Sequence, residues 1–595
     1  MSDAHWNPYP IQSPLNVRDI VIRAAHVTMR DGVKIAVDVY LPKNHPQNKT
    51  LPAILLGTRY FRRSRYRFPF QNWMWTQTTL TQRHFLANGY AWVGMDARGT
   101  GASTGHWAAP WTENEISDYA EVMDWVIRQP WSNGRLGAVG ISYNGTSAEM
   151  MAHTKHPALK AVIPMFSLFD LYPDIAYPGG IHLSWFIENW THGNHALDTN
   201  QVHKEKIFPL LVRLLSRGVQ PVDDDSDREQ LRAAIAQRSN NWNTYHGVTS
   251  APFRGDWLIH LPGDTFDDLS PHAHLEAVAE SNVAVYSYGG WFDGAYPRAC
   301  VNRYLSVKNP NRRLTLGAWN HGGSHNCTPT VRQPTQFNHF AEMIRFFDTY
   351  VKGIETHLQD EPPIHYYTMV EEKWKSAESW PPLAQEKTLY FHAGNQLLAD
   401  MPAENKAADS YQANYQTGTG NHARWNSLIG GGVVTYADRS ALEPALLTYT
   451  SAALEQDTEV TGHPLVRLFI ASSTTDAQVF VYLEDVTPNG QVHLVTEGQL
   501  RAIHRKASVA PYQTPVPYHA FTRADAQPLI PNETIELVID LLPTSYLFQR
   551  GHRLRVSIAG ADKDHFEIPN TPPPLFTIQR SHTYASAIIL PVVKP

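Results

Sequence analysis

Short apolar runs separated by amphipathic stretches set the pattern of the first third of the chain. Apolar residues dominate 51–56, 90–95 and 136–141, and turn residues bound each run. Such runs are typical of buried strands in a parallel sheet. Between them, 71–88 and 113–128 carry apolar positions at helical spacing. Strands that alternate with helices predict crossover βαβ units and a mostly parallel sheet.

The pattern also predicts how this sheet begins and continues. Residues 19–41 alternate polar and apolar positions around Arg30-Asp31-Gly32, which predicts an antiparallel hairpin. Thr112 and Glu115 have the spacing of a capping box at the start of the helix 113–128. Further strands are expected at 161–165, 282–288 and 313–317, with a closing helix at 337–352.

Two later regions depart from the βα rhythm. Residues 168–275 are rich in Trp and His and contain helix-like segments at 206–217 and 227–238, so a helical cap over the sheet is expected. From about 363, short strands follow one another without a long helical pattern, and Pro488-Asn-Gly490 predicts a hairpin turn. This part predicts an all-β domain, a two-sheet jelly roll.

Composition and charge narrow the class of protein. The 595 residues are 42% hydrophobic and 18% charged with a net charge of −6, which suits about two to four globular domains. No basic tail, apolar window of ~20 residues or signal-peptide pattern is found. Two cysteines are too few for a disulfide framework. We therefore expect a cytoplasmic protein with no nucleic-acid or membrane partner, and self-association stays open.

The run 136–141 ends on a serine held between glycines, Gly140-Ile-Ser-Tyr-Asn-Gly145. A strand, a sharp turn at Ser142 and a following helix would be the nucleophile elbow of an α/β-hydrolase. The usual pattern has glycine two residues after the serine, where this chain has Asn144. A plain glycine-rich turn is the alternative interpretation of the motif alone.

An acid and a base follow in the order that α/β-hydrolases use. Asp293 comes directly after the predicted strand 282–288, and His321 after the strand 313–317. Because active sites lie at the carboxyl ends of parallel strands, Ser142, Asp293 and His321 are predicted to meet as nucleophile, orienting acid and base. Tyr60, on the loop after 51–56, and the backbone N–H of Tyr143 are predicted to stabilise the oxyanion.

The predicted fold class is therefore α/β: an α/β-hydrolase core with a helical cap insertion and a C-terminal jelly roll. The expected divisions are a core formed by 1–167 and 276–362, a cap at 168–275 and a jelly roll at 363–595.

Several motifs resemble those of the cocaine esterase-like (CocE/NonD) hydrolases, also called the X-Pro dipeptidyl-peptidase-like or S15 family. These are the elbow, the segment Asp96-Ala-Arg-Gly-Thr-Gly-Ala-Ser-Thr-Gly105, Gly-Trp-Phe-Asp-Gly294 and Gly-Ala-Trp-Asn-His321. The resemblance implies the same three-part fold, hydrolysis of a small-molecule ester or amide through an acyl-enzyme, and an oxyanion contact from the Tyr60 hydroxyl. No cofactor or metal is expected.

The substrate class is less specified by the sequence. The family that this chain resembles includes carboxylesterases, α-amino-acid ester hydrolases or β-lactam acylases, and proline-specific dipeptidyl peptidases. No carboxylate follows Asp293 directly, which disfavours an α-amino acyl group, although Glu188 or Asp170 could hold an amino terminus. An apolar acyl pocket is predicted from four aromatic residues, with cap packing as their alternative role: Trp185, Phe186, Trp190 and Trp291.

Other features admit further hypotheses. Five arginines between 59 and 67 predict a solvated loop or subunit contact, or else a basic mouth for acidic acyl groups. Cys300 and Cys327 are expected to be small buried residues. A non-catalytic ligand-binding protein and a metallohydrolase using His321 and His325 remain alternatives to the leading hypothesis, a serine carboxylic-ester hydrolase.

Overall fold

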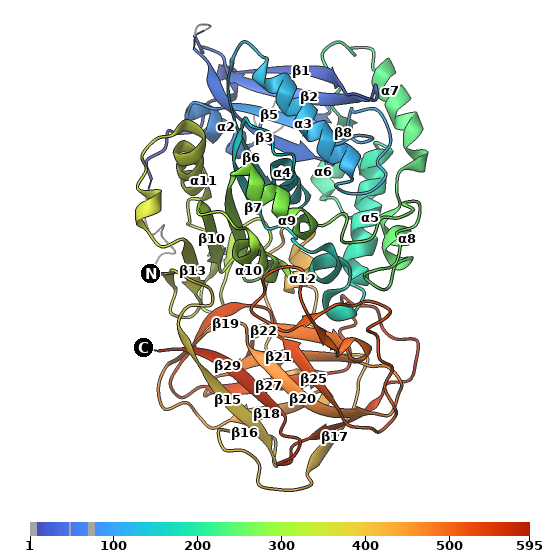
Figure 1. Cartoon of the computed structure of the whole chain (residues 1–595), viewed down its shortest axis with the longest axis vertical. Helices are drawn as coiled ribbons and strands as arrows, with labels where there is room; N and C mark the ends of the chain where they lie inside the picture. The colour runs from blue at the N-terminus through green and yellow to red at the C-terminus, as the bar shows by residue number, and fades with distance from the viewer. Residues whose placement is uncertain (1–8, 47–48, 69–77, 595) are drawn as a thin grey trace.

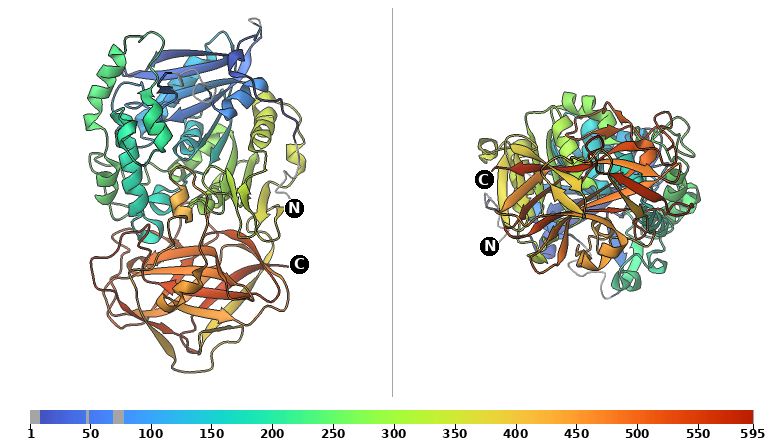
Figure 2. Two further views of the ribbon diagram at one scale, coloured as in Figure 1. Left: turned by 180° about the vertical axis from the view of Figure 1, so that it is seen from behind. Right: turned by 90° about the horizontal axis from the view of Figure 1, so that it is seen from below.

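The computed structural model describes residues 9–46, 49–68 and 78–594. An α/β part with a ten-stranded sheet lies above an all-β part, and helices flank the α/β part along one side (Figure 1). The same stacking is seen from behind in Figure 2. This arrangement agrees with the fold class that the sequence predicts, while the domain boundaries themselves stay predictions.

The large sheet has the order β1-β2-β5-β3-β6-β7-β9-β10-β13-β14. The antiparallel pairs lie toward the edges, β1 with β2, β2 with β5 and β13 with β14, and the strands from β5 to β13 are parallel. The predicted hairpin and strands are confirmed. The bounds are β1 (Ile20–Thr28), β2 (Lys34–Pro42), β3 (Leu51–Thr58), β5 (Ala91–Asp96), β6 (Ser132–Ile141), β7 (Leu159–Met165), β9 (Ala284–Gly290), β10 (Arg312–Gly317), β13 (Ile364–Thr368) and β14 (Lys373–Ala377).

Crossover helices cover this sheet. They are α2 (Leu80–Ala87), α3 (Glu113–Ile127), α4 (Tyr143–His153), α10 (Tyr296–Ser306) and α11 (His339–Phe347), which a π turn extends to Lys352. The helices predicted at 113–128 and 337–352 are confirmed, and that at 71–88 is confirmed from Leu80, its residues 71–77 lying outside the described chain.

The capping box predicted at Thr112 and Glu115 is wrong. The Thr112 side chain makes no capping hydrogen bond. Glu115 points into the core instead, where its carboxyl accepts hydrogen bonds from the hydroxyls of Tyr119 and Tyr143. Two buried phenols are stronger partners for this carboxyl than an exposed helix end, so tertiary contacts override the local motif.

The cap is helical, as predicted. Its helices are α5 (Ser184–Asp198), α6 (Leu210–Leu215), α7 (Glu229–Ala236) and α8 (Thr244–Thr249), and α9 (Leu275–Ser281) leads from the cap back into β9 of the core. The helix-like pattern at 206–217 ends earlier than expected, because β8 (Ser216–Val219) pairs with β4 (Ser64–Tyr66) of the loop after β3. This small ribbon joins the cap to the arginine-rich loop.

Most strands of the all-β domain join into one continuous 13-stranded sheet, and β23 (Ala507–Ser508) and β24 (Tyr518–His519) form a separate two-stranded ribbon. β29 makes this connection because it pairs with β15, β20 and β19. Its longer strands are β15 (Ala384–His392), β18 (Leu447–Ser451), β19 (Thr458–Gly462), β20 (Leu465–Ser472), β21 (Gln478–Val486), β22 (Val492–Arg501), β25 (Ile535–Asp540), β26 (Thr544–Phe548), β27 (Arg553–Ala559), β28 (Leu575–Gln579) and β29 (Ala587–Val593). The hairpin predicted at 488–490 joins β21 to β22.

A short helix of this all-β domain, α12 (Arg424–Ser427), was not expected from the sequence. It rises above the jelly roll toward the cap and the core (Figures 1 and 2).

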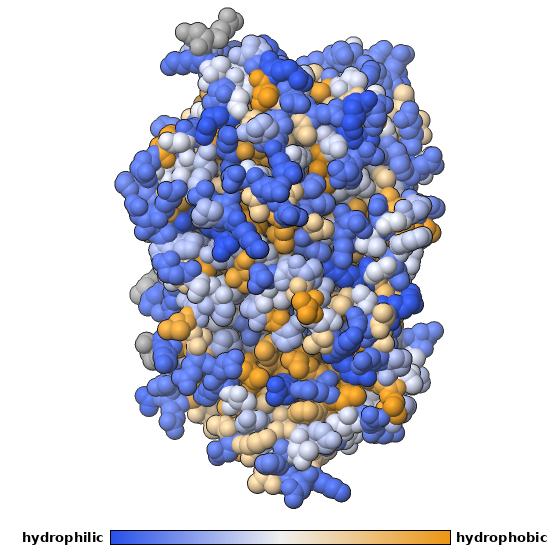
Figure 3. All heavy atoms as spheres, viewed as in Figure 1, coloured by the Kyte–Doolittle hydropathy of each residue, from blue (hydrophilic) through white to orange (hydrophobic). Residues whose placement is uncertain are grey.

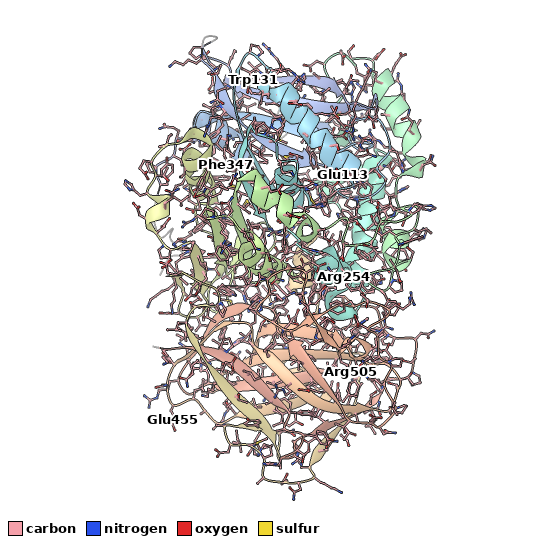
Figure 4. The ribbon with its side chains drawn as sticks, viewed as in Figure 1. Glu113, Trp131, Arg254, Phe347, Glu455 and Arg505 are labelled. Carbon is pink, nitrogen blue, oxygen red and sulfur yellow. The ribbon has the colours of Figure 1, made fainter. Side chains whose placement is uncertain are left out.

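Hydrophobic residues gather on the lower part of the face in Figure 3, over the jelly roll, whereas the upper part is more hydrophilic. Arg254 marks the boundary between cap and jelly roll in Figure 4.

Candidate active site

Ser142 occupies a strained turn between β6 and α4. Its φ of 63° and ψ of −127° are unusual for a residue with a side chain. The backbone N–H of Ser142 donates to the carbonyl of Met165 at 3.0 Å, which holds the turn against β7. A Cβ on Gly140 would lie 2.3 Å from the Asn144 backbone, and one on Gly145 would lie 2.7 Å from the Met165 carbonyl oxygen. Glycine is therefore required at 140 and 145, whereas position 144 tolerates asparagine.

Asp293 and His321 lie at the ends of neighbouring strands β9 and β10. His321 Nδ1 and Asp293 Oδ1 are 2.7 Å apart, and both side chains are buried. Because a carboxylate can only accept, Nδ1 carries the proton and Nε2 remains an acceptor. The rings of Phe166 and Tyr296 pack near the His321 imidazole, with centroid distances of 6.2 Å and 5.9 Å. His321 lines the same cavity as Ser142.

The Tyr60 hydroxyl lies beside Ser142. It accepts a hydrogen bond from Trp190 Nε1 at 2.8 Å and is also hydrogen-bonded with the Ser142 side chain. Since the indole only donates, the O–H of Tyr60 is free to donate toward Ser142. Burial raises the pKa of Tyr60, while the two hydrogen bonds and the nearby Arg59 charge oppose that rise. The phenol therefore stays protonated at neutral pH.

A buried ion-pair network holds the loop that carries Tyr60. Asp96 accepts from the backbone N–H of Arg62 at 2.5 Å and pairs with its guanidinium at 2.8 Å. Arg62 also pairs with Asp38 at 3.0 Å. A Cβ on Gly101, at a φ of +53°, would lie 2.0 Å from Asp96 Cγ, so this motif can close only with glycine there.

The expectation of a solvated or basic arginine loop is wrong for the arginines that flank Tyr60. Arg59 is fully buried, lies 4.2 Å above the Trp107 ring and pairs with Asp198 of the cap at 3.0 Å. Arg63 pairs with Asp38 at 2.8 Å. These guanidiniums turn inward to carboxylates, and none of them lines either of the two cavities described below.

Replacing Asp96 with alanine is expected to destabilise the fold by about 3–5 kcal/mol, because it leaves Arg62 buried with a partner removed. The measurement is urea unfolding of both proteins. The matched control is Asp31→Ala, which removes a half-exposed partner of Arg98 and should cost about 0–1 kcal/mol. Equal losses from the two substitutions would show that the Asp96 network does not hold this loop.

Glu115 is a site residue whose role sequence reasoning missed. Its carboxyl accepts from Tyr143 Oη at 2.6 Å and from the backbone N–H of Trp111 at 3.2 Å. Burial raises the pKa of Glu115, and the hydrogen bonds of the two tyrosines oppose that rise. The Tyr143 ring also stacks on Trp111 with centroids 4.6 Å apart. The hydrogen bond to Glu115 and the stacking on Trp111 hold the Tyr143 side chain, and this fixes the position of the first turn of α4 and of its first N–H.

Two cavities meet at Ser142, and both are lined by Tyr60 and Trp190. The inner cavity has about 600 Å³ of empty space, and its further lining comes from the cap and core, including Trp111, Leu168, Leu171, Ile175, Phe186, Ile187, Trp242, Val248, Phe266 and Tyr296. The outer cavity has about 1130 Å³ of empty space when the open solvent at its mouth is included, and its further lining includes His321, Gly193, Leu197, Ile207, Phe208, Pro209 and residues 428–431.

The predicted aromatic residues separate into two pairs. Phe186 and Trp190 line the inner cavity. Trp185 instead packs against His565 of the jelly roll, 5.8 Å between ring centroids. Trp291 is buried elsewhere, its Nε1 donating to the Tyr367 carbonyl at 2.8 Å. Trp185 and Trp291 line neither cavity. Trp185 packs between the cap and the jelly roll, and the Trp291 indole is held by its hydrogen bond to the backbone.

The acids considered for holding an amino terminus also lie away from the cavities. Asp170 is buried against Arg254 at 2.7 Å and accepts from Tyr512 Oη at 2.8 Å. Asp170, Asp267 and His272 approach one another as metal ligands would, but Arg254 pairs with both carboxylates and supplies the positive charge there. Glu188 is exposed on α5.

Both cysteines are free and buried, as expected. Burial raises the pKa of Cys300 to about 12 and that of Cys327 to about 11, so both thiols stay neutral.

None of the helices in the described part of the chain has the length and apolarity needed to cross a bilayer.

A parallel sheet with a serine turn at its centre, a cap and a C-terminal all-β domain defines an α/β-hydrolase with a jelly roll. The family model for the X-Pro dipeptidyl-peptidase (S15 family) matches residues 31–323. The model for the X-Pro dipeptidyl-peptidase C-terminal non-catalytic domain matches residues 356–590. The chain belongs to this S15 family and is a serine hydrolase.

Individual proteins agree with that assignment. A Mycobacterium bovis protein named as a serine esterase is 44% identical over 625 residues, covering 100% of this chain and 99% of its own. Cocaine esterase of a Rhodococcus species is 24% identical over 616 residues, 96% of this chain and 98% of its own. The structure of a CocE/NonD family hydrolase from Staphylococcus aureus, at 20% identity, shares the fold with a TM-score of 0.71 and covers 97% of this chain and 94% of that one.

Proposed function

We propose that this protein is a carboxylesterase in which Ser142, His321 and Asp293 act as a catalytic triad. The observation that carries the proposal is the 2.7 Å contact from Asp293 to His321, which lines one cavity with Ser142. His321 Nε2 takes the proton of Ser142 as its oxygen attacks the acyl carbon, and then gives it to the leaving alcohol. Water, deprotonated in the same way, releases the acyl group from Ser142. Asp293 fixes the imidazole tautomer and offsets its transient charge.

The oxyanion of each tetrahedral intermediate would receive two hydrogen bonds. One donor is the backbone N–H of Tyr143, at the first position of α4, where N–H groups have no intrahelical partner. The other is the Tyr60 hydroxyl, which stays protonated beside Ser142. The ion pair of Asp96 with Arg62 in the Tyr60 loop, and the hydrogen bond from the Tyr143 hydroxyl to Glu115, would keep both donors in place.

The inner cavity favours esters of neutral, apolar acids. Its lining among the described residues carries no aspartate, glutamate, lysine or arginine. An acyl group with an ammonium or carboxylate would lose hydration there without gaining a partner. The alternatives are an Xaa-Pro dipeptidyl peptidase, after which the family model is named, and an amidase or β-lactam acylase. A dipeptidyl peptidase needs an acid near the substrate amine, and Asp170 and Glu188 line neither cavity.

A substrate panel tests this choice. The p-nitrophenyl esters of benzoic and medium-chain acids should be turned over with a kcat/KM at least tenfold above that of aminoacyl esters and Xaa-Pro anilides. Fluorophosphonate labelling, located by peptide mass spectrometry, should modify Ser142 in the wild type and no residue in Ser142→Ala. Preference for the anilides would support the peptidase, and a folded wild type that never labels would point to a non-catalytic protein.

A further inference from the structure

We infer that the outer cavity is the binding site for the leaving alcohol, and that it selects esters whose alcohol is bulky, neutral and apolar. The inference rests on the proposed esterase function. It assigns the two cavities that meet at Ser142 to the two halves of the ester, and it gives the jelly roll a part in substrate choice.

The position of His321 assigns the two sides. A triad histidine must deliver its proton to the leaving oxygen, so the leaving group departs on the side where the imidazole lies. His321 lines the outer cavity and does not line the inner one. The alcohol must therefore extend into the outer cavity, and the acyl group takes the inner cavity.

The walls of the outer cavity define what it can hold. Gly193 and Leu197 come from α5, Phe208 from the segment after it, and residues 428–431 from the jelly-roll domain. The lining includes no acidic or basic side chain other than His321 among the described residues. About 500 Å³ of this space can hold a ligand, which is large for a methyl or ethyl group, and burial of apolar area there would favour a bulky alcohol.

The jelly-roll wall is fastened to the two loops that carry Asp293 and His321. Ser427 Oγ donates to the Phe292 carbonyl at 3.0 Å, one residue before Asp293. Asn320 Nδ2, one residue before His321, donates to the Gly431 carbonyl at 2.7 Å. A wall held by both loops has a fixed distance to the reacting atoms, as a specificity-determining surface requires. This segment lies within the region that matches a domain described as non-catalytic.

Gly193 offers a direct way to fill this cavity. A Cβ there would meet Ile207 at 3.7 Å and Phe208 at 4.0 Å, which are ordinary contacts, and glycine in a helix is readily replaced. Gly193→Leu should therefore fold normally and occupy the outer cavity. Ile429→Phe narrows the same cavity from the jelly-roll side. The control Gly255→Leu makes the same change at an exposed cap glycine with open space around it.

The experiment compares two ester series on each variant. One series holds benzoate constant and varies the alcohol from methyl to cyclohexyl to naphthyl, and the other holds methanol constant and varies the acid. Gly193→Leu and Ile429→Phe should each lower the naphthyl-to-methyl ratio of kcat/KM by about ten- to a hundredfold. Their acid preference and the deacylation rate of the common benzoyl-enzyme should follow wild type, because the alcohol has left by then. Val248→Phe, in the inner cavity, should change the acid preference alone, and Gly255→Leu neither.

A shift in acid preference from Gly193→Leu, or in alcohol preference from Val248→Phe, would overturn the assignment of the two cavities. An unchanged alcohol ratio in Ile429→Phe would overturn the role of the jelly roll. Failure of the proposed esterase function has a different signature, since wild type would then hydrolyse neither series.

Discussion

Replacing Ser142 with alanine should lower kcat for ester hydrolysis by about a million-fold, the loss seen when a triad nucleophile is removed from serine hydrolases. Without the hydroxyl no acyl-enzyme forms, and only binding and the oxyanion donors remain to assist direct attack by water. The strained φ of 63° belongs to the backbone, so alanine keeps it and the melting temperature should change little. Steady-state turnover and thermal unfolding, measured on one preparation, check both statements.

The control for this substitution is Ser281→Ala at the end of α9, far from both cavities, where the hydroxyl donates to the Val278 carbonyl and accepts from the backbone N–H of Val283. It should keep the turnover of wild type. If Ser142→Ala retained turnover within tenfold of wild type, the nucleophile would have to be another group. Since burial keeps both thiols neutral, the two cysteines would not supply it.

The order of the α/β part could be predicted from sequence because its signals are local. The apolar run 136–141, which is buried from Leu136 to Gly140, lies inside a parallel sheet that is covered on both faces, so it shows in the sequence as a continuous apolar stretch. Asp293 and His321 directly follow such runs, so their meeting at the sheet edge could be inferred before their 2.7 Å contact was known. The continuous jelly-roll sheet could not, because the three partners of β29 are decided by strand pairing across long sequence separations.

The surroundings of the site were less predictable for the same reason. Glu115 has the spacing of a helix cap, and nothing nearby in sequence indicates that Tyr143 would donate to it. The sequence around Arg59 and Arg62 indicates a basic loop. In the structure these arginines pair with Asp198 of the cap and Asp96 at the end of β5, which are distant in sequence. Residues 428–431 carry no chemical group that marks an active site. Their position depends on hydrogen bonds with Asn320 and Phe292, more than 100 residues away.

Replacing Tyr60 with phenylalanine should lower kcat by about a hundred- to a thousandfold, equivalent to about 3–4 kcal/mol of transition-state stabilisation. The donated hydrogen bond is expected to strengthen as charge develops on the oxyanion, so the loss should fall on kcat with little change in KM. The ring remains, and with it the edge-to-face contact with Tyr143 at 5.8 Å, so unfolding should be close to that of wild type.

Trp190→Phe separates this donor role from simple packing. The indole donates to the Tyr60 oxygen at 2.8 Å, so its removal leaves the phenol in place but less well oriented. A smaller fall in kcat than for Tyr60→Phe is therefore expected, together with a change in KM because Trp190 lines both cavities. Turnover of Tyr60→Phe at the rate of wild type would remove the hydroxyl from the oxyanion site. The second hydrogen bond to the oxyanion, beside that from the Tyr143 N–H, would then have to come from a backbone N–H of the loop that Asp96 holds.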